Sequence, residues 1–196
     1  MNRKQLEELL LQSLEHEKGG VEVYTTAVRC AQNEELKEEW QKYLGETKEH
    51  VEKLQALCSE LGIDVDVETP GQKVVRTIGT ALVSAMELAL AEGDPAAAEI
   101  VAAECVVDAE TKDHHNWELI GKVAEKTKGA EGKALKEAYD EVEDEEDEHL
   151  YHSKGWLREL SLQGLGMKAQ LPPPEEEKDV KSATSQARVE QQRKSR

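Results

Sequence analysis

The chain has 196 residues, with 25 Lys and Arg against 42 Asp and Glu, a formal net charge of −17 and no Phe. This length suits one domain of ordinary size. A surface this acidic repels nucleic-acid phosphates and anionic lipid, so we expect neither nucleic acid nor a membrane as a partner. No run of about 18 apolar residues occurs, and the amino-terminal segment MNRKQLEELL lacks the apolar core of a secretion signal. We therefore expect a soluble, cytoplasmic protein.

Three cysteines, Cys30, Cys58 and Cys105, form no C-x-x-C pair. An odd count without such a pair fits a reducing compartment better than a disulfide framework. We expect all three to be buried thiols.

Helix signals divide the first 162 residues into five segments. Prolines occur only at Pro70, Pro95 and in the run 172–174, so long stretches rich in Glu, Leu, Ala and Lys are free of helix breakers. Asn33 is placed as a helix cap, and Thr69-Pro70-Gly71-Gln72 has the pattern of a capping box. The sequence predicts an all-α fold with helices near 3–32, 34–61, 70–92, 95–127 and 131–162.

After Gly166 the chain becomes QLPPPEEEKDVKSATSQARVEQQRKSR. This segment has almost no apolar surface to offset the entropy of ordering it. We therefore expect one helical domain over 1–162 and a disordered tail over 163–196.

Acidic side chains interrupt the apolar stripes of four of these helices. Glu17 and Glu110 lie at the centres of the stripes on the first and fourth helices. On the fifth helix Glu146 and His149 form an inward-facing Glu-x-x-His pair, and on the second a looser pattern places Glu46 and His50 near the stripe. Asp113 and His114 also lie near a stripe, where we interpret them as ordinary polar flanks.

Burying an unpaired carboxylate costs several kcal/mol, so inward acids on several helices need a common explanation. Two divalent cations would neutralise four carboxylates, and two neutral imidazoles would complete the ligand shell. Di-iron carboxylate bundles use this donor set, with a Glu from each of two helices and a Glu-x-x-His from each of two others. The predicted metal ligands are Glu17, Glu46, His50, Glu110, Glu146 and His149.

These motifs resemble those of the ferritin-like superfamily. Residues 35–62, ELKEEWQKYLGETKEHVEKLQALCSELG, are similar to the second helix of the YciF-like stress proteins, a rubrerythrin-related branch. The similarity continues through 93–120, and 135–157 resemble the last helix of bacterioferritins and rubrerythrins. The resemblance implies an antiparallel four-helix bundle with an additional crossover helix, frequent dimers, and a dinuclear iron or manganese site.

By position, the resemblance implies that Glu17 and Glu110 are terminal carboxylate ligands and that Glu46 and Glu146 bridge the metals. It implies that His50 and His149 are the imidazole ligands. One departure stands out, because Thr47 occupies the position three residues before His50 where the family pattern has a Glu.

The expected function is a reaction of two iron or manganese ions with dioxygen or hydrogen peroxide in stress protection, in a homodimer. The chain lacks the four-cysteine iron domain of classical rubrerythrins, so the electron donor would be external. Three alternatives stay open: manganese catalase-like dismutation, iron storage in a closed cage, and a metal-free helical dimer that acts as an interaction module.

Overall fold

The computed structural model describes residues 2–168 and 170, and within them the only regular secondary structure is α-helical. The predicted all-α class is therefore confirmed. The helices are α1 (Arg3–Cys30), α2 (Glu34–Glu60), α3 (Pro70–Glu92), α4 (Pro95–Lys126), α5 (Ala130–Asp140) and α6 (Glu143–Gly164).

The helix ends follow the capping signals in the sequence. The side chain of Asn33 accepts hydrogen bonds from the first backbone amides of α2. Thr69 and Gln72 form a complete capping box at the start of α3, and Asp94 caps α4 after Gly93 in the left-handed region (φ 79°). These local interactions fix where α2, α3 and α4 begin.

The expected single helix over 131–162 is wrong, because the chain breaks between α5 and α6. Val142 has φ −126° and ψ −29°, and its side chain is fully buried in the core. Its amide bonds back to the carbonyl of Tyr139, which closes a turn, while its own carbonyl accepts from the amide of Glu146. The segment contains no Gly or Pro at this point, and the residue at the break, Val142, packs with buried apolar residues such as Leu54 and Leu135.

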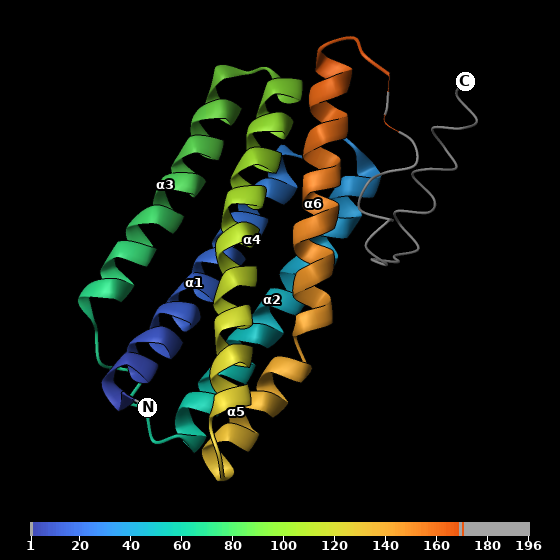
Figure 1. Cartoon of the computed structure of the whole chain (residues 1–196). Helices are drawn as coiled ribbons and strands as arrows, with labels where there is room; N and C mark the ends of the chain where they lie inside the picture. Colours follow the sequence, from blue (N-terminus) through green and yellow to red (C-terminus); the bar gives the residue numbers. More distant parts are fainter. Residues whose placement is uncertain (1, 169, 171–196) are drawn as a thin grey trace.

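Two pairs of neighbouring helices form the body of the molecule (Figure 1). α1 packs against α2, and α4 packs against α6, while α1 also contacts α4. α3 covers α1 and α4 at one edge, opposite α6, and α5 packs mainly against the end of α4. The result is a helical bundle whose interior is lined by α1, α2, α4 and α6.

Two apolar clusters fill the interior at different heights. The first, which we call the aromatic cluster, includes Tyr24, Trp40, Tyr43, Met86 and Trp156. The second, which we call the leucine cluster, includes Leu10, Leu14, Leu54, Ile120 and Leu135. On each of the four lining helices, the inward residues between the two clusters are charged or polar. This polar layer is the most unusual feature of the core.

α3 leaves an apolar face uncovered. Val74, Ile78 and Leu88 are 59%, 56% and 64% exposed. By length and composition alone α3 is apolar enough to cross a membrane, with a mean hydropathy of 1.5 over an 18-residue window of which 11% is buried. One such helix does not establish a membrane span, and the absence of a membrane partner stays a prediction.

The helical domain ends close to the predicted boundary. α6 continues to Gly164, two residues beyond the expected end at 162, and residues 171–196 of the predicted tail lie outside the described residues. Cys30, Cys58 and Cys105 are free and buried, as expected.

Gly121 and Gly45 allow a matched test of helix packing. A Cβ atom at Gly121 would lie 2.8–2.9 Å from the ring of Tyr139, whereas a Cβ atom at Gly45 would meet nothing within 4 Å. We expect Gly121→Ala to lower the free energy of unfolding by about 1–3 kcal/mol through overpacking of α4 against α5. Gly45→Ala should raise it by about 0.5–1 kcal/mol. Urea unfolding of both variants measures this, and a shift of the same sign in both would contradict the packing.

Candidate metal centre

Five of the six predicted ligands meet inside the bundle, in the polar layer between the two apolar clusters. They come from all four lining helices, and each is 3% exposed or less: Glu17 on α1, His50 on α2, Glu110 on α4, and Glu146 and His149 on α6. Their helices bring them together because each occupies the inward position between a residue of the leucine cluster and one of the aromatic cluster.

The five residues form two groups of three that share Glu146. One group is Glu17, His50 and Glu146, and the other is Glu110, Glu146 and His149. Within each group, one potential ligand atom per residue lies within 4.8 Å of the others. Glu146 is therefore the one residue that belongs to both groups.

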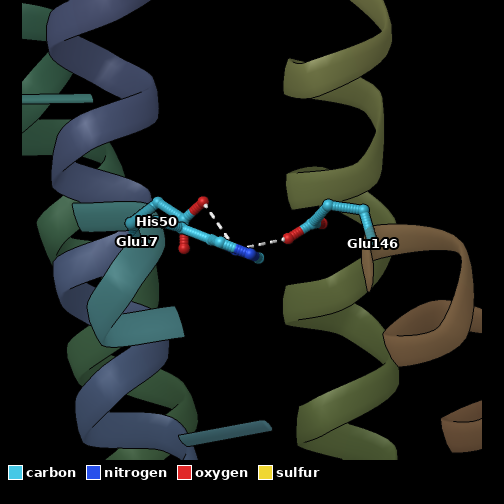
Figure 2. A group of neighbouring side chains, drawn as sticks. All are labelled: Glu17, His50 and Glu146. Atoms are coloured by element: carbon cyan, nitrogen blue, oxygen red, sulfur yellow. Dashed lines mark ion pairs between the residues drawn. The ribbon is translucent and has the colours of Figure 1, made fainter. Parts of the chain in front are cut away.

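His50 presents one ring nitrogen to the centre and the other to an outer carboxylate. Its Nδ1 lies 3.0 Å from Oε1 of Glu146 and 3.5 Å from Oε1 of Glu17 (Figure 2). Its Nε2 lies 2.7 Å from Oε2 of Glu145. A carboxylate behind a histidine fixes the ring orientation and the tautomer, as is common for metal-binding histidines. Glu145 lies one residue before Glu146 in the acidic run and is not among the residues predicted from the sequence.

His149 repeats this arrangement in the second group. Its Nδ1 lies 3.6 Å from Oε2 of Glu110 and 3.9 Å from Oε1 of Glu146, while its Nε2 lies 3.0 Å from Oε2 of Glu46. The two imidazole rings are stacked, with centroids 5.7 Å apart. Each histidine therefore turns Nδ1 toward the shared carboxylate and Nε2 toward an orienting acid.

Glu46 belongs to neither group of three. Its side chain is 18% exposed and lies 3.3 Å from the ammonium of Lys42, on the outer side of His149. Thr47, which stands where the family pattern has a Glu, is buried, and its Cγ2 would lie 3.2 Å from a Cβ added to Gly20 of α1. Thr47 thus packs closely against α1 at Gly20, and a side chain at position 20 would require Thr47 to shift.

Asp113 is buried beside the five centre residues, which differs from its interpretation as an ordinary polar flank. It is 4% exposed, and burial followed by the negative charges of Glu17, Glu146 and Glu110 raises the pKa of its carboxyl well above the ordinary value. Its Oδ1 is buried and has no hydrogen-bond partner among the described residues. The signal for it was present, since Glu110-x-x-Asp113 has the same three-residue spacing as Glu146-x-x-His149.

Aromatic side chains from both apolar clusters contact the charged residues of the centre. The indole of Trp117 donates a hydrogen bond of 2.7 Å to Oε1 of Glu17. The ring of Tyr43 lies against His149 at a centroid distance of 4.2 Å, and its hydroxyl donates to Glu39 at 2.8 Å. These contacts restrict the side chains that face the centre.

The ionisation of the centre shows how these acids are stabilised. Burial opposes the charge on His50, but hydrogen bonds to Glu146 and Glu17 raise its pKa to about 11. Burial likewise opposes the charge on His149, but the neighbouring carboxylates of Glu110 and Glu46 raise its pKa to about 10. Burial raises the pKa of Glu146 to about 7. Protons on the imidazoles thus compensate the carboxylates, in a position where cations would do the same.

The residues fit a pair of metal ions. Within the part of the chain that the structure describes, Oε2 of Glu17, of Glu110 and of Glu146 are buried and have no hydrogen-bond partner. A buried oxygen without a partner costs free energy, and a coordinated cation removes this cost. The donors, carboxylate oxygen and imidazole nitrogen, are those that iron and manganese accept.

Comparisons with known proteins give no family for this chain. No family model matches it, and neither a curated protein nor a solved structure matches it.

The raised pKa values predict how stability depends on pH after treatment with a chelator. The folded-state pKa values of His50 and His149 exceed their ordinary value of 6.5, so the stability they contribute is present below about pH 6.5 and is lost as the pH rises through 10. The raised pKa of Glu146 acts in the same direction between pH 4.5 and 7. We expect the melting temperature to fall by at least about 3 °C between pH 6 and pH 9.

Calorimetry on the chelator-treated protein measures this slope. His115→Gln removes an exposed histidine and should leave the slope unchanged, whereas His50→Gln should flatten it. A melting temperature that is constant or rises over this range would contradict the ionisation described above.

Proposed function

We propose that this chain is a dinuclear metal protein of the ferritin-like type, rubrerythrin-related, whose two cations share Glu146. One observation carries the proposal: two buried groups of three ligands, drawn from four helices, have this one carboxylate in common. A surface cluster of acids arises easily in so acidic a chain, but a buried one with a shared member does not.

The charges of the centre support two divalent cations. Glu17, Glu110, Glu146 and Asp113 supply four carboxyl groups, which two divalent ions neutralise. In this proposal Asp113 takes the place of Glu46 in the charge balance. Oxygen-rich ligation with one imidazole for each metal favours iron or manganese.

The chemistry that we propose is a two-electron reaction with dioxygen or hydrogen peroxide, for which bound iron or manganese would supply the electrons. The chain itself holds the ligands through Glu145, Glu46 and Trp117, and the two apolar clusters limit the access of water. The chain has three cysteines, too few for a four-cysteine iron domain, so the proposal includes an external electron donor. It also includes a homodimer in the cytoplasm and a role in stress protection.

A second candidate is a metal-free helical dimer that serves as an interaction module. One observation favours it, since His50 and His149 form ion pairs with Glu146 and Glu46 at 3.0 Å and so compensate part of the buried charge without a metal. Three carboxylate oxygens without hydrogen bonds favour the metal protein over this candidate.

Metal content tests this proposal directly, because the loss of the shared carboxylate should affect both metals. We expect about two iron or manganese atoms per chain in protein purified without chelator. Glu146→Ala should lose both metals, because it removes the ligand common to both groups, whereas Glu17→Ala should lose mainly one. Elemental analysis measures the content, and fewer than one atom per chain in the parent would refute the dinuclear proposal.

Glu46→Gln is the matched control for that measurement. Within the centre Glu46 pairs with the outer nitrogen of His149 and belongs to neither group of three, so this variant should still bind two metals at saturation, with an affinity about 10–100-fold lower. A loss of both metals in Glu46→Gln would place Glu46 among the direct ligands.

Peroxide consumption separates the possible reactions. We expect the metal-loaded protein to consume hydrogen peroxide faster with an added reductant than without one. Equal rates under both conditions would favour catalase-like dismutation, which needs no donor. No turnover under either condition, together with a large assembly in gel filtration, would favour iron storage instead.

A further inference from the structure

A cavity of about 260 Å³ leads from the surface to the polar layer between α4 and the α5–α6 turn. Its outer wall includes Asp147 and Glu118, which are exposed, and its inner wall includes Trp117 and Glu146. Its lining therefore includes the one residue, Glu146, that both groups of ligands share.

Most of the ionisable groups on the wall of this cavity are acidic. Glu118, Glu143, Glu146 and Asp147 supply carboxylates, and His114 is the one basic side chain among its lining residues. Nε2 of His114 lies 2.8 Å from Oδ1 of Asp147, whose side chain is 51% exposed. Both the charge and the oxygen chemistry of this wall suit a divalent cation and oppose an anion.

The inner end of the cavity offers the cation a ligand. Glu146 is 1% exposed, and its Oε2 has no hydrogen-bond partner among the described residues. The acidic wall thus includes a residue whose buried carboxylate oxygen has no hydrogen-bond partner. Six water molecules at about 30 Å³ each occupy about 180 Å³, so a hydrated cation fits the volume.

The larger cavity of the molecule does not serve this purpose. It has a volume of about 780 Å³ and lies between α1, α3 and α4, where Val75, Ile78 and Leu82 contribute an apolar wall. None of the five centre residues lines it. Glu15, Asp108 and Glu118 also line this cavity, but a cation there would meet no ligand of the centre.

We propose that the smaller cavity is the entrance for divalent cations, and that Asp147 and Glu143 bind the ion before it reaches Glu146. This inference rests on the proposed metal centre and adds its loading path. The incoming ion displaces His114 from Asp147 and exchanges its water for carboxylate oxygens along the wall. These acids raise the rate of loading, whereas the centre determines how much metal is held.

The rate of Co²⁺ loading tests this proposal. The chelator-treated protein is mixed with Co²⁺ in a stopped-flow instrument at low ionic strength. The quenching of tryptophan fluorescence is followed over time. Trp117 reports on the centre because it donates a hydrogen bond to Glu17. We expect the variant Glu143→Gln, Asp147→Asn to load at least about 5-fold more slowly, with the same final stoichiometry. The difference should shrink in 0.5 M salt, because salt screens the attraction.

The control is the variant Glu104→Gln, Asp108→Asn, which removes the same two charges from exposed positions on α4, where Asp108 lines the larger cavity. It should load at the rate of the parent. Equal rates in the parent and the entrance variant, or equal slowing in both variants, would overturn the entrance while leaving the metal centre intact. A lower final stoichiometry in the entrance variant would also overturn it, because these acids would then hold metal. Failure of the parent to bind Co²⁺ at all would refute the centre itself.

Discussion

Charged groups that water would normally solvate are held together between two apolar clusters, and their mutual neutralisation is the constraint on which the arrangement of the helices depends. Glu17, Glu110 and Glu146 are each 3% exposed or less, so none can be stabilised by solvent. A shift of one residue along any lining helix would turn its acid away from the histidines and bury it without compensation. The polar layer thus fixes the relative heights of α1, α2, α4 and α6 more strictly than apolar packing alone would.

The two histidines show how this layer is supported from outside. Each points Nδ1 inward and gives Nε2 to a carboxylate nearer the surface, Glu145 for His50 and Glu46 for His149. Each supporting acid lies on the helix that carries the other histidine. α2 and α6 are therefore cross-linked twice through the centre, although their backbones make few direct contacts.

Much of the fold could be predicted from the sequence, because the signals for it are local. The Asn33, Thr69 and Asp94 caps mark where helices begin, and the inward period of Glu17, Glu110 and Glu146 is visible in the stripes. The α5–α6 break could not be predicted, since no Gly or Pro marks it in the sequence. The position of Glu46 outside the two groups and the burial of Asp113 depend on how the helices pack against one another. Such effects arise only once helices have packed.

The burial of the three cysteines determines how their thiols react with oxidants. Burial raises the pKa of Cys58 and of Cys105 to about 11, and it also raises the pKa of Cys30. At neutral pH all three are therefore protonated thiols, and the thiolate is the form that peroxide oxidises to sulfenic acid. These three are all the cysteines that the chain has. Sulfur oxidation at neutral pH is therefore expected at exposed methionine, such as Met167, before any of the cysteines.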